Sequence, residues 1–188
     1  MPTGGQAVLI SGGESEEGAR DSLLIYELET HAMLHLALPS MSSPRSHHVA
    51  VWVPSRQYIY LTGGTSPGGS GLGSIDVYDV LGNAILTPQG FGLKQPRYGH
   101  AGARAGENQV VLAGGAVDGA PLDSAELIHE SFDATANATT IDVALLSDKL
   151  PAPVIGPRAV RIGGGAVLFA GGLTATGAPS TQLVCYQP

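Results

Sequence analysis

The sequence predicts an all-β fold made of four repeated units, and three observations lead to this prediction. An apolar strand that ends in a glycine pair occurs four times, as "AVLISGG", "YIYLTGG", "QVVLAGG" and "AVLFAGG". The first glycines of the pairs are 51, 51 and 57 residues apart, and a period near 50 residues is typical of repeated supersecondary units. Glycine accounts for 27 of the 188 residues and charged residues for only 13%, which favours many short strands joined by tight turns.

The last three units are each predicted to begin with a strand that follows a Pro-Arg pair. A turn then leads to the apolar second strand, which the glycine pair closes. Because glycine has no Cβ, such a pair allows positive φ angles and close approach of neighbouring backbones. The glycines are therefore predicted to be architectural. The positions are Arg45, Arg97 and Arg158 for the arginines, and Gly12, Gly13, Gly63, Gly64, Gly114, Gly115, Gly171 and Gly172 for the pairs.

A third strand is predicted after a polar loop of variable length in every unit, and a fourth, less regular strand follows. Counted from the second glycine, Tyr26, Tyr78, His129 and Tyr186 come 13 or 14 residues later, which predicts one shared structural position. Two segments, 27–38 and 137–150, also fit an amphipathic helix, since periodicity alone does not separate the two structures. We expect strand or irregular structure for the first segment, while the second allows either.

Four strands per unit and a glycine pair after the second strand resemble the kelch repeat, whose units form the blades of a β-propeller. The resemblance covers nearly the whole chain and implies one domain, 1–188, with units at about 1–42, 43–94, 95–155 and 156–188. Kelch units usually carry a tryptophan about seven residues after the tyrosine, whereas Met33, Ile85 and Ala136 stand there in this chain. The residues that carry the resemblance are Arg45 with His48, Arg97 with His100, the glycine pairs, Tyr26, Tyr78 and Tyr186.

The resemblance implies a non-catalytic module that binds a protein or another macromolecule through its loops, 14–21, 65–73, 116–123 and 173–180. An enzymatic alternative remains, because some kelch propellers are copper radical oxidases of the galactose oxidase type and others act on sialic acid. In that case the catalytic residues would lie outside this chain. Cys185 and Tyr186 are neighbours on a predicted strand and face opposite sides, so they cannot form the Cys-Tyr thioether of the oxidases with each other.

The histidines are predicted to form structural hydrogen bonds rather than to bind a metal. His47 and His48 are adjacent on a predicted strand and cannot both reach one ion. His48 and His100 each come three residues after a Pro-Arg arginine, and Arg161 takes that place in the last unit. A position that accepts arginine is not a metal ligand, so the sequence predicts neither a metal nor a cofactor.

The repeated arginines are expected to anchor the blades, since a buried arginine needs partners for all its donors. The carboxylates Asp21, Asp76 and Asp123 lie near the predicted starts of third strands, where they are expected to cap turns.

Composition excludes several classes of partner. With a net charge of −7 and only two lysines, the chain offers no basic surface for nucleic acid. It has no run of 18 apolar residues that could span a membrane as a helix. A single cysteine excludes an internal disulfide and leaves the cellular compartment undetermined.

Counting predicted strands gives 3, 4, 4 and 3 in the four units, two short of four complete blades. Strand edges that stay unpaired recruit partners. We therefore expect either a piece of a propeller of six or seven blades, or an open arc that associates with itself through its end blades.

Overall fold

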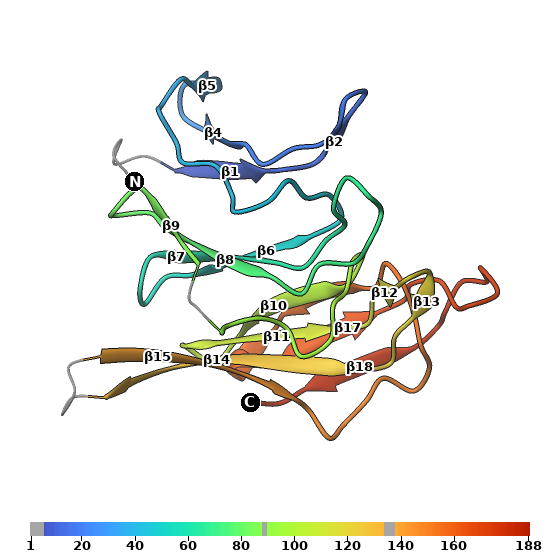
Figure 1. The fold of residues 1–188 in the computed structure, drawn as a ribbon. Helices are drawn as coiled ribbons and strands as arrows, with labels where there is room; N and C mark the ends of the chain where they lie inside the picture. The colour runs from blue at the N-terminus through green and yellow to red at the C-terminus, as the bar shows by residue number, and fades with distance from the viewer. Residues whose placement is uncertain (1–5, 88–89, 134–137) are drawn as a thin grey trace.

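The chain is all-β, as predicted, in a computed structural model that describes residues 6–87, 90–133 and 138–188 (Figure 1). The strands form four antiparallel sheets in chain order and two small hairpins. Within the described ranges the only helical element is a 3-10 turn at Gly163–Gly165.

The first sheet contains β1 (Ala7–Ser11), β4 (Leu23–Glu27) and β5 (Ala32–Leu34). The second contains β6 (Val49–Val53), β7 (Tyr58–Thr62), β8 (Ile75–Asp79) and β9 (Ala84–Leu86). The third contains β10 (Ala101–Ala105), β11 (Gln109–Ala113), β14 (Ala125–Asp133) and β15 (Ala138–Leu145). The fourth contains β16 (Arg158–Arg161), β17 (Val167–Ala170) and β18 (Leu183–Tyr186). The hairpins are β2 (Glu14–Ser15) with β3 (Gly18–Ala19), and β12 (Ala116–Val117) with β13 (Ala120–Pro121).

The segments that also fitted a helix are not helical where the structure describes them. Residues 27–38 contain the end of β4, a turn and β5. Residues 138–145 form β15, which pairs with β14, and residue 137 lies outside the described residues. A short apolar pattern fits a helix and a strand equally well, and here pairing with a neighbouring strand decides for the strand.

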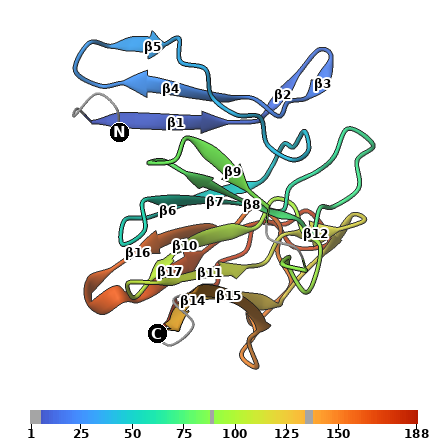
Figure 2. The ribbon, with the colours of Figure 1, turned by 60° about the vertical axis from the view of Figure 1, so that its left-hand side comes forward.

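Each sheet packs against the next one in the chain (Figures 1 and 2). Side chains on a strand alternate between its two faces. In β7, Ile59 and Leu61 therefore join the cluster shared with the first sheet, while Tyr60 joins the cluster shared with the third. A further cluster, which includes Val111 and Phe169, lies between the third and fourth sheets.

The first strands of the last three sheets lie side by side, with β10 between β6 and β16 (Figure 2). Small residues make this approach possible. A Cβ on Gly102 would lie 3.1 Å from Cγ1 of Val49 and would overlap the Leu112 side chain. The run "AGARA" of β10 thus fits a position crowded from both sides.

The glycine pairs lie where the second strand of one sheet meets the linker to the next sheet. In the first three pairs the second glycine donates its N–H to a linker carbonyl: Gly13 to Arg45 at 3.0 Å, Gly64 to Arg97 at 2.9 Å and Gly115 to Val154 at 2.8 Å. These contacts place Arg45, Arg97 and Val154 at one structural position.

The prediction that Arg158 is equivalent to Arg45 and Arg97 is therefore wrong. In the last unit Pro153 and Val154, rather than Pro157 and Arg158, match the Pro-Arg pairs of the two units before it. Arg158 is exposed at the start of β16, and Pro157 takes the place of His48 and His100 beside the glycine pair. The carbonyl that accepts the N–H of the second glycine sets this register, and in the last linker that carbonyl belongs to Val154 rather than to Arg158.

The shared position of Tyr26, Tyr78 and Tyr186 extends to Ile128, not to His129. These four residues face Val8, Ile59, Val167 and Val110 in the second strands, each four residues before its glycine pair. The connection in the third unit is one residue shorter than in the second, which shifts the count. Ile128 is buried and His129 is exposed.

Candidate functional site

The two arginines Arg45 and Arg97 are fully buried, and each binds a carboxylate of the third strand in its own sheet. Arg45 donates to the Gly63 carbonyl at 3.0 Å and to Asp76 Oδ2 at 3.0 Å. Arg97 donates to the Gly114 carbonyl at 2.8 Å and to Glu126 Oε1 at 2.8 Å. All four charged side chains are 0% exposed, so none of them can meet a ligand from solvent.

The expectation that Asp76 caps a turn is wrong, because it lies inside β8. Its carboxylate accepts the Ser42 N–H at 2.9 Å in addition to the arginine, and Glu126 accepts the N–H groups of Lys94 and Gln95. Burial lowers the pKa of Arg45 and of Arg97, and the facing carboxylate offsets this in part. Each pair thus fastens a linker to the sheet that follows it.

His48 and His100, three residues after these arginines, each connect one sheet to the sheet before it. Nε2 of His48 shares a hydrogen bond of 2.7 Å with Ser11 Oγ, and Nε2 of His100 shares one of 3.0 Å with Thr62 Oγ1. Burial, followed by the charge of the nearby arginine, lowers the pKa of His48 to about 4 and that of His100 to about 3. Both imidazoles are therefore neutral at pH 7.

We expect the free energy of unfolding to decrease as the pH falls below about 6.5, because the unfolded chain then binds protons that the folded chain refuses. The stabilisation is complete above that value and is lost progressively toward pH 4, by up to about 1.4 kcal/mol per pH unit for each histidine. Urea midpoints measured across this range test the expectation. In His100→Gln the dependence on pH should be shallower, and an unchanged slope would show that His100 does not contribute.

The tyrosines of the shared position differ in their surroundings. The Tyr78 hydroxyl donates to Asn83 Oδ1 at 3.0 Å, and burial raises the pKa of Tyr78 and of Tyr186. Tyr26 lies on the outward face of the first sheet, in β4.

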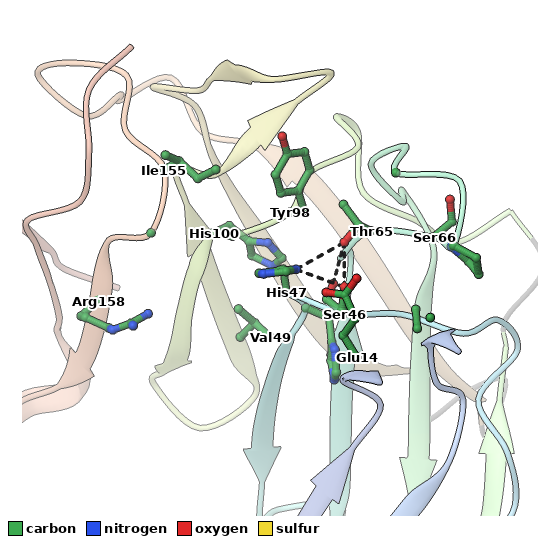
Figure 3. Close-up of a pocket in the computed structure, with 17 residues that line it drawn as sticks. Glu14, Ser46, His47, Val49, Thr65, Ser66, Tyr98, His100, Ile155 and Arg158 are labelled. Carbon is green, nitrogen blue, oxygen red and sulfur yellow. Dashed lines mark hydrogen bonds between the residues drawn. The ribbon is translucent and has the colours of Figure 1, made fainter. Parts of the chain in front are cut away.

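A pocket of about 600 Å³ opens beside the glycine pairs, where β6, β10 and β16 begin (Figure 3). Its volume falls within the range of ordinary ligand sites. Residues of two predicted binding loops, 14–21 and 65–73, line one part of it, and the linkers that lead into the second, third and fourth sheets line the rest.

His47 lies in the middle of this pocket with its backbone in the left-handed region, at φ 55° (Figure 3). The corresponding residues of the next two linkers are Gly99, at φ 58°, and Gly156, at φ 68°. A chain of backbone hydrogen bonds identifies the three as equivalent, because Gly99 N–H donates to the His47 carbonyl at 2.8 Å and Gly156 N–H to the Gly99 carbonyl at 2.7 Å. A side chain thus occupies a conformation that the other linkers reserve for glycine.

The His47 ring is held by two hydroxyl groups. Nδ1 lies 3.1 Å from Ser46 Oγ and 3.5 Å from Thr65 Oγ1, and the two hydroxyls lie 2.9 Å apart. Ser46 and Thr65 also form a β-bridge, which fixes both to the backbone.

Charged and aromatic groups surround this cluster (Figure 3). Glu14 and Arg158 both line the pocket, as do the Tyr98 and Ile155 side chains. The Arg158 side chain forms no hydrogen bond or ion pair with any residue that the structure describes, so its guanidinium can meet an acidic or carbonyl group of a ligand. The pocket offers hydrogen bonding, charge of both signs and apolar contact within one cavity.

Sequence reasoning considered His47 only as a metal ligand and missed this conformation. The signal was present in the aligned linkers "RSHH", "RYGH" and "VIGP", where histidine replaces a glycine. Finding it required the correct alignment of the last linker, which the misplaced Pro-Arg pair concealed.

Among the described residues no group of three or more His, Cys, Asp or Glu side chains could hold a metal ion. Cys185 is exposed in β18. No helix of the described part of the chain has the length and apolar character needed to cross a membrane.

Comparison with known proteins adds no family to these observations. No protein-family model matches the chain, and no curated protein is similar to it at a significant level.

Proposed function

We propose that the chain is a β-propeller of the kelch type, or part of one, and that it works as a non-catalytic module that binds a protein. Three features support the proposal: successive antiparallel sheets that pack on each other, first strands that lie side by side, and glycine pairs that join each sheet to the next linker. The partner docks over the pocket around His47.

The conformation of His47 is the observation that carries this proposal. Left-handed backbone costs a residue with a Cβ about 1–2 kcal/mol relative to its ordinary conformations, and residues held in this way cluster at functional sites. Glycine at the equivalent positions shows that this fold does not require a side chain there. The histidine therefore serves contact with a ligand.

A protein segment fits the chemistry of the pocket. Imidazole and hydroxyl groups suit the hydrogen-bonding groups of a peptide backbone, Arg158 suits a carboxylate, and Val49, Tyr98 and Ile155 suit an apolar side chain. The lining loops give the partner a surface beyond the pocket itself.

His47→Gly separates binding from stability. We expect this variant to be as stable as the wild type, or up to about 1 kcal/mol more stable, because glycine adopts positive φ without strain. We also expect it to lose most of its affinity for peptides selected from a displayed random library on the wild-type protein. Thermal midpoints measure the first effect and calorimetric titration of the selected peptides the second.

His31→Gly is the matched control. His31 also has φ 55° but lies in the turn between β4 and β5, outside the pocket. It should share the effect on stability and leave binding unchanged. Peptides that bind His47→Gly as tightly as the wild type would refute the proposed site, and binding of sugars in place of peptides would refute the proposed class of partner.

A further inference from the structure

The first sheet has one apolar face that no described segment covers. On this face lie Val8 and Ile10 of β1, Leu24 of β4 and Met33 of β5, with exposed fractions between 38% and 46%. Strand pairing joins Ile10 to Leu24 and Val8 to Tyr26, so the residues form one continuous surface. We name it the leading face.

The fourth sheet also has an open apolar face, on the side that is turned away from the third sheet. Val160 of β16 is 55% exposed and Leu183 of β18 is 66% exposed. Pairing places Leu168 between Val160 and Cys185, and Ala170 beside Leu183. We name this the trailing face.

The leading face is equivalent to the faces that the other sheets turn toward the sheet before them. Counted back from the glycine pairs, Val8 and Ile10 correspond to Ile59 and Leu61, which pack in the cluster shared with the first sheet. By the same count Leu168 and Leu183 of the trailing face correspond to Tyr60 and Ile75, which pack toward the third sheet.

The two open faces are thus the two halves of a contact that the chain already forms three times. Two of these three contacts contain a buried arginine–carboxylate pair and the third is apolar, and the residue at the position of Leu24 shows which kind the open faces fit. The position of Leu24 holds Asp76 and Glu126 in the second and third sheets, where a linker arginine neutralises each carboxylate. In the fourth sheet it holds Val184, which faces an apolar cluster instead. Leu24 therefore needs no arginine, and a bare apolar face can cover it.

We propose that the leading face of one copy of this chain packs on the trailing face of a second copy. Two copies joined head to tail in both directions give a closed ring of eight sheets, and eight lies within the range of about four to eight blades that propellers have. A head-to-tail contact closes only if its rotation allows it, and closure with two copies requires the four sheets of one copy to span half of the ring. Arg158, which lines the pocket around His47, pairs with Ala170 at the edge of the trailing face. The contact proposed here uses the apolar residues of the two faces, so this inference does not depend on the proposed function.

Light scattering of the chromatographed protein tests the inference. The wild type should have twice the mass of one chain at micromolar concentrations. Leu24→Asp, on the leading face, and Leu183→Asp, on the trailing face, should each give a monomer, because each places a charge in both contacts of the ring. Leu81→Asp is the control, since Leu81 is 71% exposed in the turn after β8 and lies on neither face; it should remain a dimer.

The wild-type protein offers a second measurement that needs no substitution. Cys185 is the only cysteine and lies on the trailing face. Its reaction with a maleimide should slow several-fold as protein concentration rises, because dimerisation covers the thiol. A wild type that stays monomeric with a constant rate would overturn the inference, and so would a dimer that only one of the two aspartate variants disrupts, since that dimer would join identical faces.

Discussion

Arg97→Val is expected to lower the free energy of unfolding by about 3–5 kcal/mol, because it leaves the Glu126 carboxylate buried without its counter-charge. The loss also removes the donors that the Gly114 and Ser124 carbonyls now use. Unsatisfied buried acceptors add to the cost. Of the single substitutions considered, this one should have the largest effect.

The chain itself shows how the loss can be offset. In the contact between the third and fourth sheets, Val154 stands at the position of Arg97 and Val184 at that of Glu126. The double variant Arg97→Val with Glu126→Val copies this solution. It should be more stable than Arg97→Val, because the apolar pair leaves no charge buried.

A third substitution makes the contact between the second and third sheets resemble the contact between the third and fourth sheets more closely. Glu126 accepts the Gln95 N–H at 3.1 Å, whereas Gln182 Oε1 accepts the equivalent Ala152 N–H at 3.3 Å. Gln182 corresponds to Ser124, so adding Ser124→Gln to the double variant supplies the missing acceptor. Urea unfolding of the wild type, Arg97→Val, Glu126→Val and the double variant gives the coupling energy of the pair, and the triple variant shows what the added acceptor contributes. A double variant no more stable than Arg97→Val would mean that the buried carboxylate is not what makes the single change costly.

The all-β prediction succeeded because the repeated pattern is long and the glycine pairs mark the end of the same strand four times. The succession of strands along each unit followed from the same repeat. Strands buried on both faces, such as β7 and β11, gave continuous apolar runs that a sequence shows clearly.

The errors arose where the register of a repeat shifts by one or a few residues. The partner of the third glycine pair is a Pro-Val dipeptide that looks unremarkable in sequence, while a true Pro-Arg pair stands four residues later. Likewise, one residue fewer in the loop of the third unit moved the shared position from His129 to Ile128. Sequence offsets cannot detect such shifts, because hydrogen bonds to the glycine N–H and C=O groups set the register.

The candidate site was less accessible to sequence reasoning than the fold. Asp76 and Glu126 differ in chemical type and stand in apolar strands, so their pairing with the arginines emerges only from three-dimensional contacts. His47 is informative only when its backbone angle is compared with those of Gly99 and Gly156. Both observations depend on equivalences between repeats, which the structure defines by hydrogen bonding.

Gly63→Ala is expected to lower the free energy of unfolding by about 3 kcal/mol, from two separate causes. Gly63 has φ 59°, and a left-handed residue with a Cβ costs about 1–2 kcal/mol. The new Cβ would also overlap the Arg97 carbonyl oxygen. Forcing backbone apart in a packed region costs about 1–3 kcal/mol more. The affected carbonyl belongs to the linker that leads to the third sheet.

Gly171→Ala is the matched control, because Gly171 is the equivalent glycine in the last sheet. Its φ is 69°, so the backbone strain is the same. The nearest atom to its added Cβ is the Ser180 carbonyl oxygen at 3.9 Å, an ordinary contact, since none of the described linkers passes there. We therefore expect a loss of only about 1–2 kcal/mol.

The difference between the two variants isolates the contact between a sheet and the following linker. Urea midpoints at one pH give both losses on a common scale. If Gly63→Ala and Gly171→Ala prove equally destabilising, the glycine pairs are needed only for their dihedral angles. A larger loss at Gly63 means that the absence of a side chain is what lets one sheet approach the next, which explains why the pair recurs at each such junction along the chain.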